Sequence, residues 1–79
     1  MDNINITVFV GKRIKILRTQ AGLTQEALAQ KAGVDRSYIV GIEIAKRNVS
    51  LGKLDKICKA MNVNFFEIFS ENVDYSQQK

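Results

Sequence analysis

The apolar residues in the first third of this 79-residue chain recur with helical spacing. Val10, Ile14, Leu17 and Ala21 are four, three and four positions apart, which places them along one stripe of a helix. Before them, residues 3–8 alternate polar and apolar side chains, a pattern that fits either a strand or the frayed start of the same helix. We expect a solvated face to carry the basic residues outside the stripe, Lys12, Arg13 and Lys15.

Two short segments follow, and each has its own start and stop signals. Thr24 is a good N-cap for the first, and Gly33 can take the left-handed conformation that ends it. Asp35 is the expected N-cap of the second, whose buried edge is formed by Ile39 and Ile42. The pattern predicts two helices joined by a tight turn.

The last third of the chain predicts two further helices. Ser50 caps a helix that Asn62 closes, and its apolar stripe consists of Leu51, Leu54, Ile57, Cys58 and Met61. Asn64 and Glu67 form a capping box at the start of a final helix. That helix is apolar nearly all round, with Phe65, Phe66, Ile68 and Phe69. The fold class predicted from these elements is all-α, a compact bundle of five helices without a sheet.

Composition narrows the possible functions. Hydrophobic residues make up 46% and charged residues 25%, and without Pro or low-complexity stretches the chain is expected to be one domain, residues 1–79, with a core at about 8–70 and a polar tail at 71–79. There is no His and one Cys, Cys58, which excludes His-dependent nucleophilic catalysis, His-ligated metal sites and an internal disulfide. We find no acid pair and no phosphate-binding glycine loop. The chain is therefore expected to be no enzyme and to hold no cofactor or metal.

Charge and hydropathy indicate the partner and the compartment. Residues 1–60 hold eleven of the twelve Lys and Arg with five of the eight acids, a net charge of +6, whereas residues 61–79 carry −2. A basic body favours nucleic acid over a membrane surface as the partner. No apolar run approaches the roughly 20 residues that span a bilayer, and the N-terminus lacks the basic start of a signal peptide. These features, with a single thiol, predict a soluble cytoplasmic protein.

The two middle helices have the spacing of a helix-turn-helix. Ala29 is small enough for the two helices to approach, Gly33 makes the turn, and Ile39 and Ile42 anchor the second helix. The opposite side of this second helix then presents Arg36, Ser37, Val40, Gly41 and Ile44. In such a motif the second helix enters the DNA major groove.

The run AGLTQEALAQKAGVDRSYIVGIEIAKRNVS resembles the phage-repressor and Cro-like class of helix-turn-helix proteins. The resemblance covers about residues 10–70, and DRSYI followed by KRNVS is most similar to the controller proteins of restriction–modification systems. It implies a lambda-repressor-like fold and a sequence-specific, double-stranded-DNA-binding transcriptional regulator. It also implies a homodimer on a palindromic operator, with no small-molecule effector evident.

The resemblance carries roles to individual positions. It implies base contacts from the exposed face of the second helix of the motif, by Arg36, Ser37 and Val40. It implies contacts with the DNA backbone by Thr24, Gln25, Tyr38, Lys46, Arg47 and Asn48, and for the last three the flanking minor groove is the alternative. It further implies a structural ion pair between Arg18 and Glu43. Lys53 is near enough to a helix start to reach a phosphate, although Lys53, Lys56 and Lys59 also fit a solvated face.

Four positions depart from the family pattern. Members commonly have a polar residue where this chain has Val40, Arg or Asn at Ile44, and Gly at Ala45. Val40 and Ile44 can contact thymine methyl groups but form no hydrogen bonds with bases. Gly41 stands where relatives often have a base-contacting side chain. We therefore expect sparse direct contacts with bases and a larger contribution of DNA shape.

Two alternatives concern the final helix and the function. The final helix either completes the core of one protomer or forms a dimer interface, for which we expect Phe65, Phe69 and Ile68 to face the partner. The alternative to a DNA-binding regulator is an antitoxin-like protein-interaction module in which DNA binding is secondary.

Overall fold

The computed structural model describes residues 5–70, and the predicted tail at 71–79 lies outside these residues. The described residues form five helices and no strand, so the predicted all-α class is confirmed. In chain order the helices are α1 (Ile6–Gln20), α2 (Gln25–Ala32), α3 (Arg36–Glu43), α4 (Leu51–Met61) and α5 (Phe66–Phe69).

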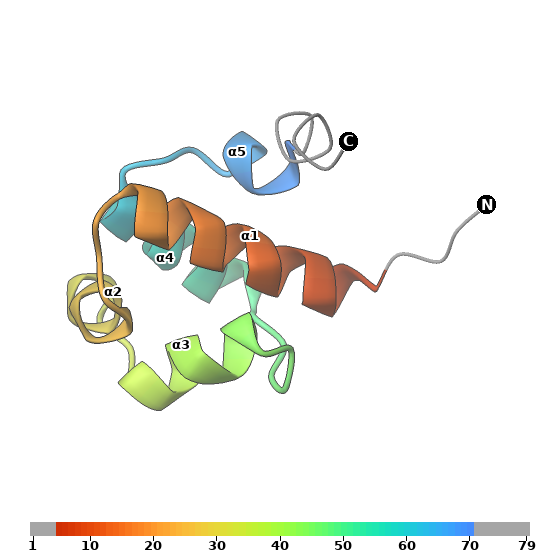
Figure 1. Cartoon of the computed structure of the whole chain (residues 1–79), viewed down its shortest axis with the longest axis horizontal. Coiled ribbons are helices and arrows are strands. Elements are labelled where there is room, and N and C mark those ends of the chain that lie inside the picture. The colour runs from red at the N-terminus through yellow and green to blue at the C-terminus, as the bar shows by residue number, and fades with distance from the viewer. Residues whose placement is uncertain (1–4, 71–79) are drawn as a thin grey trace.

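The helices are arranged around α1, the longest of them. Figure 1 shows α3 and α5 on opposite sides of α1, with α4 behind it and α2 at one end. Helix α2 packs against α3 and α4, and α1 packs against α3 and α5. This arrangement separates the helix-turn-helix from the C-terminal helix.

One apolar core lies between the helices. Its fully buried side chains come from all five helices and are Ile14, Leu28, Ile39, Ile42, Ile57 and Ile68. The predicted buried edge of α3 is therefore confirmed. Leu51 is an error of the predicted stripe, because its side chain is 84% exposed. It is the first residue of α4, and it borders two surface hollows instead of the core.

The helix starts follow the predicted capping signals with one exception. The Thr24 and Ser50 hydroxyls accept hydrogen bonds from the Ala27 and Lys53 amides at 2.9 and 3.2 Å. Asp35 occupies the N-cap position of α3 with extended backbone, but its carboxylate makes no capping hydrogen bond. The side chain is exposed, so water can solvate it instead. The start of α3 consequently depends on tertiary packing more than on its cap.

Asn side chains cap the start of α1 and take part in the capping box before α5. Asn64 Oδ1 accepts from the Glu67 amide at 3.3 Å, and Glu67 Oε2 accepts from the Asn64 amide at 3.2 Å. This reciprocal pair is the predicted capping box. Asn5 Oδ1 accepts from the amides of Thr7 and Val8. The described part of the open segment at residues 3–8 is therefore the capped start of α1.

Arg13 corrects the expectation of a solvated face on α1. Its side chain is buried, its Nε donates to the Ile68 carbonyl at 3.1 Å, and its Nη2 donates to the Glu67 carbonyl at 2.7 Å. These carbonyls belong to α5, a single turn that cannot pair them within itself. Arg13 therefore attaches α5 to α1.

Candidate nucleic-acid interface

Helix α3 is held at its buried edge and open on the opposite face. Gly33 has φ 73°, so it makes the left-handed turn between α2 and α3. Ile39 and Ile42 are buried beneath α3, whereas Arg36, Ser37 and Ile44 are exposed. Val40 lies on the same face, one turn after Arg36, and Gly41 lies at its edge, and both positions are half-buried. The predicted base-contacting residues thus share the open side of one helix.

A buried polar network fixes α3 to the two preceding helices. Arg18 Nε donates to Glu43 Oε2 at 2.6 Å, and Arg18 Nη2 donates to Glu43 Oε1 at 3.1 Å. Arg18 also donates to the Leu23 carbonyl at 2.8 Å, and Gln25 Nε2 donates to Glu43 Oε1 at 3.1 Å. The ion pair implied by the family resemblance is therefore present, and it joins α1, α2 and α3.

The N-terminus of α2 faces solvent with part of its backbone unpaired. Thr24 accepts one first-turn amide through its hydroxyl. The amides of Gln25 and Glu26 have no partner within a helix, because the first turn leaves such groups free. Amides at this position and the helix dipole together favour a phosphate. Since the Gln25 side chain binds Glu43, a phosphate contact at this residue falls to its backbone N–H.

The chain after α3 makes an unusual turn. Ala45 has φ 61°, a left-handed conformation that favours glycine, and an alanine there is strained by about 1 kcal/mol or more. Lys46, Arg47 and Asn48 follow it, and all three are exposed. Asn48 Oδ1 accepts from Thr7 Oγ1 at 2.8 Å, so the Asn48 side chain attaches the turn to the start of α1.

Two cations gather at the Tyr38 ring. The guanidinium carbon of Arg47 lies 5.5 Å from the ring centroid, and Lys53 Nζ lies 5.9 Å from it. A cation over an aromatic face at this distance is stabilised by about 0.5 to 1 kcal/mol when exposed. The predicted backbone contacts Tyr38 and Arg47 are thereby brought together, and Lys53 joins them from α4.

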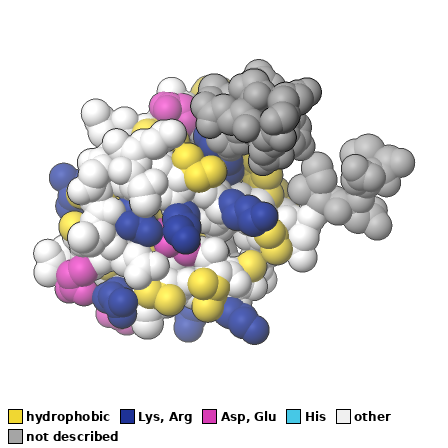
Figure 2. Space-filling model, in the orientation of Figure 1, with side chains coloured by type: hydrophobic (Ala, Val, Ile, Leu, Met, Phe, Trp, Pro, Cys, Tyr) yellow, Lys and Arg dark blue, Asp and Glu magenta, His cyan; other side chains and the backbone are white. Residues whose placement is uncertain are grey.

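The surface around α3 is mixed basic and apolar. Figure 2 shows dark-blue basic side chains along the lower edge, where Figure 1 draws α3 and the turn after it, with hydrophobic side chains among them and magenta acidic side chains at its left end. Among residues 5–70, Arg36, Lys46 and Arg47 form no salt bridge. This side of the molecule therefore offers positive charge to a polyanion.

A second exposed surface lies at α5. Phe66, Phe65 and Phe69 are 70%, 55% and 49% exposed. Ile68 is fully buried in one protomer, which corrects its expected place in a dimer interface. The single turn of α5 directs Ile68 into the core beside Arg13 and leaves the phenylalanines outside. The final helix therefore both completes the core and exposes an apolar surface.

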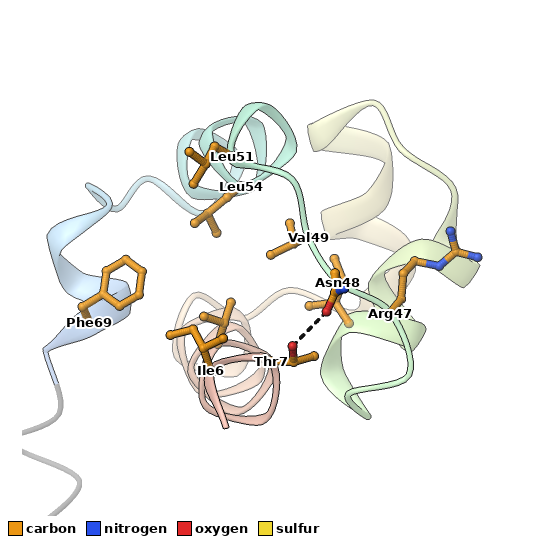
Figure 3. Close-up of a pocket in the computed structure, with 10 residues that line it drawn as sticks. Ile6, Thr7, Arg47, Asn48, Val49, Leu51, Leu54 and Phe69 are labelled. Carbon is orange, nitrogen blue, oxygen red and sulfur yellow. Dashed lines mark hydrogen bonds between the residues drawn. The ribbon is translucent and has the colours of Figure 1, made fainter. Parts of the chain in front are cut away.

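An apolar hollow of about 410 Å³ adjoins this surface between the starts of α1 and α4. In Figure 3, Leu51 and Leu54 of α4 border it from above, Ile6 and Thr7 of α1 from below and Phe69 of α5 from the left. The Arg47 side chain points away from it. A neighbouring hollow of about 230 Å³ shares Leu51, Leu54 and Phe69 and adds Phe65. The two hollows and the phenylalanines form one continuous surface, which we call the Phe65/Phe69 surface.

The described part of the chain also bears on metal binding, on thiol reactivity and on crossing a membrane. Residues 5–70 contain no cluster of His, Cys, Asp and Glu that could hold a metal ion. Burial raises the pKa of the Cys58 thiol, and the carboxylates of Asp55 and Glu67 raise it further. Cys58 is thus a neutral core residue at ordinary pH. Among these residues no helix is both long and apolar enough to cross a bilayer.

Sequence reasoning missed two glycine contacts. A Cβ on Gly11 would overlap the Ile42 carbonyl oxygen, so α1 and the end of α3 meet backbone to backbone. A Cβ on Gly41 would lie 3.2 Å from Arg47 Cβ. The available signal was the position of each glycine inside a predicted helix, where glycine weakens the helix and therefore indicates a close approach.

Comparison with known proteins adds to this geometry. Residues 14–68 match a family model described as helix-turn-helix. The chain is 38% identical over 68 residues to the control protein C.MunI of a Mycoplasma species, covering 85% of this chain and 92% of that protein.

Two solved structures are similar in fold and sequence. The restriction–modification controller protein C.AhdI from Aeromonas hydrophila superposes with a TM-score of 0.78 at 44% identity, covering 81% of this chain and 97% of that one. The controller protein C.Esp1396I, solved as a tetramer in complex with its natural 35-base-pair operator, gives 0.79 at 35% identity, covering 98% and 100%.

Proposed function

The chain belongs to the helix-turn-helix family of Cro/C1-type DNA-binding transcriptional regulators, and from this premise we propose that it binds a palindromic operator as a homodimer in the manner of a restriction–modification controller. The operator-bound relative is a controller matched over 100% of its length. We propose the cytoplasm as the site of action, and the family gives no reason to expect catalysis.

One observation supports the proposal most strongly. The open face of α3 carries Arg36 and Ser37 at the N-terminal turn, and the Arg18–Glu43 network beneath it holds the helix in place. The N-terminal residues of the second helix in such motifs contact base edges in the major groove. Arg36 has the fork geometry for the O6 and N7 acceptors of guanine. Val40 is placed for thymine methyl groups, and Ser37 can bond with either kind of base edge.

Backbone contacts are proposed on both sides of α3. The amides at the start of α2, beside Thr24 and Gln25, are placed for one phosphate. We expect Tyr38, Lys46 and Asn48 to contact the phosphates that flank the groove, Asn48 through the amide nitrogen that its hydrogen bond with Thr7 does not use. These contacts fix the register of the protein on the duplex and supply the salt-dependent part of the affinity.

We propose that the Phe65/Phe69 surface is the dimer interface. A two-fold interface pairs this surface with its own copy, and the chain is small enough to benefit from the added apolar burial. In Figure 1, α5 lies across α1 from α3, which leaves α3 free for DNA when α5 is covered. A dimer would present two copies of α3 about 34 Å apart, one turn of B-DNA.

The alternative function is a protein-interaction module of the antitoxin type. Its primary partner would be another protein, whereas the match to whole controllers favours DNA, as do the exposed basic residues on and directly after α3, which are Arg36, Lys46 and Arg47. A pull-down from cells of the source organism distinguishes the two, because an interaction module would retain a partner protein after nuclease treatment.

Selection from a random pool of duplex DNA tests the proposal directly. The wild-type chain is expected to enrich a palindromic sequence, and the same duplex then serves in binding titrations at 50 and 200 mM salt. A dimer that neutralises 6 to 10 phosphates should lose at least about a hundredfold in affinity over this range. Absence of an enriched sequence, or affinity that is flat in salt, would contradict the proposed function.

A further inference from the structure

The Arg47 side chain lies along the bare backbone of Gly41. A Cβ built on Gly41 would be 3.2 Å from Arg47 Cβ, 3.5 Å from its Nε and 3.7 Å from its Cδ. The contact thus follows Arg47 from the root of its side chain to the guanidinium. A methyl group at position 41 would already crowd Arg47 Cβ, and a longer side chain would extend into the space that Arg47 occupies.

The Arg47 side chain extends back along α3, toward the N-terminus of that helix. Arg47 follows α3, yet its guanidinium lies over the ring of Tyr38, three residues before Gly41. The N-terminal half of such a helix contacts base edges. The guanidinium of an arginine from the following turn therefore lies beside the N-terminal half of α3, over Tyr38.

The turn that makes this possible is itself strained. Ala45 adopts a left-handed φ of 61°, and the Lys46 amide donates to the Gly41 carbonyl at 2.8 Å. That hydrogen bond folds the turn back onto α3 directly below Gly41. The position of Arg47 therefore follows from three local features, the bare Gly41, the turn at Ala45 and the ring of Tyr38.

We infer that Gly41 is a specificity-determining residue that acts through Arg47. By having no side chain, Gly41 lets the Arg47 guanidinium occupy the edge of the recognition surface, where it contacts a guanine as a second base-contacting arginine beside Arg36. This inference rests on the proposed function, because it assumes that α3 enters the major groove. It revises the role implied by resemblance, in which Arg47 contacts the DNA backbone or the flanking minor groove.

An arginine held in this way differs physically from one that binds a phosphate anywhere along the backbone. Contact with the Tyr38 ring and with the Gly41 backbone restricts its rotamers before DNA arrives, and such preorganisation favours a fixed contact. The planar fork of the guanidinium matches the O6 and N7 acceptors of guanine, which a lysine ammonium satisfies only as a point charge. Arg47→Lys therefore separates base recognition from charge.

The first experiment tests, without DNA, whether Arg47 contacts the backbone of Gly41. Gly41→Ala is made in the wild-type chain and in Arg47→Ala, and urea unfolding is measured for all four proteins. We expect Gly41→Ala to favour the folded state at least threefold more in the Arg47→Ala chain, a coupling typical of residues in contact. Gly52→Ala is the matched control, because nothing lies within 4 Å of a Cβ at Gly52. Gly52→Ala should change stability equally in the wild-type and Arg47→Ala chains. If Gly41→Ala also changes stability equally in the two chains, Arg47 does not contact Gly41 and the inference is wrong.

The second experiment tests specificity. Wild type, Gly41→Ala, Arg47→Lys and the double variant are each used to select from the same random duplex pool. Gly41→Ala and Arg47→Lys should lose preference at the same base pair by about fivefold or more, with the salt dependence of binding unchanged. The double variant should be no worse than either single variant.

The other possible results of the selection each contradict either the inference about Gly41 or the proposed function. Wild-type preference in Arg47→Lys, or losses at different base pairs in the two variants, would overturn the inference while leaving the proposed function intact. Enrichment of no sequence by the wild-type chain would overturn the proposed function and this inference with it.

Discussion

Arg18 Nε and Glu43 Oε2 lie 2.6 Å apart in a site from which solvent is almost excluded, and they join α1 to the last residue of α3. Arg18→Ala would leave the Glu43 carboxylate buried with only Gln25 as a partner. Breaking one side of a buried pair costs about 3 to 5 kcal/mol. We expect urea unfolding to show a loss of this size.

The exposed pair Lys59–Asp55 is the matched control for this prediction. It spans 3.1 Å on the surface of α4 with both side chains more than half exposed. Lys59→Ala should change the free energy of unfolding by about 0.5 kcal/mol or less, because solvent screens such pairs. Similar losses for Arg18→Ala and Lys59→Ala would mean that the Arg18 site is solvated in solution.

Gly11→Ala should destabilise the protein by at least about 2 kcal/mol. The added methyl group would overlap the Ile42 carbonyl, a backbone atom that cannot move without displacing α3. Gly52→Ala meets nothing within 4 Å and should stabilise α4 by about 0.5 kcal/mol. Thermal unfolding of both variants measures the contrast, and a neutral Gly11→Ala would contradict the backbone contact between α1 and α3.

Ala45→Gly should increase stability. Ala45 has φ 61°, where an L-residue is strained by about 1 to 2 kcal/mol, and glycine removes that strain at some cost in unfolded-state entropy. We expect a net gain of about 0.5 to 1 kcal/mol in denaturant titrations. Ala21→Gly is the control. Ala21 ends α1 with φ −82°, where glycine relieves no strain, so this substitution should lower the stability of the protein.

The sequence was sufficient to predict the helices, but it was insufficient to predict contacts between residues that are far apart along the chain. Capping depends on residues within one turn, so Thr24, Ser50 and the Asn64–Glu67 box were predictable from spacing alone. The burial of Arg13 was not, because it depends on carbonyls of α5 more than fifty residues away. Helical periodicity places Arg13 outside the apolar stripe and contains no information about those carbonyls.

The candidate interface was predictable to a similar extent. Resemblance to the family assigned the open face of α3 and the Arg18–Glu43 pair, and both are present. The path of Arg47 over Gly41 depends on the left-handed turn at Ala45, a residue that seldom adopts that conformation. Leu51 failed for a different reason, since periodicity gives the direction of a side chain but not whether a neighbour reaches it.

Arg36→Ala should weaken binding to the selected operator by about 1 to 3 kcal/mol and relax the preference at one guanine. Lys46→Ala should weaken binding to operator and random DNA alike, because a lysine in the turn after α3 neutralises a phosphate without contacting bases. Parallel titrations on the operator and on a scrambled duplex measure the ratio. If both variants lose the same factor on both duplexes, Arg36 is a backbone contact.

The exposed phenylalanines give a prediction about assembly that stands apart from DNA chemistry. Phe65 is 55% exposed and precedes α5, where a carboxylate is tolerated by the nearby helix start. Phe65→Asp should therefore leave one protomer folded, with its helical circular dichroism retained. In the proposed dimer, however, the aspartate would be buried against the partner without a counter-ion.

Sedimentation at micromolar concentration should accordingly show a dimeric wild type and a monomeric Phe65→Asp. Gln30→Asp adds the same charge on α2, away from the Phe65/Phe69 surface, and should remain dimeric. A monomer cannot link two half-sites, so its operator affinity should fall by orders of magnitude while its affinity for one half-site is kept. A Phe65→Asp protein that stays dimeric would move the interface to another surface. Loss of half-site affinity along with dimerisation would instead mean that α5 supports the position of α3 through α1, the helix against which both pack.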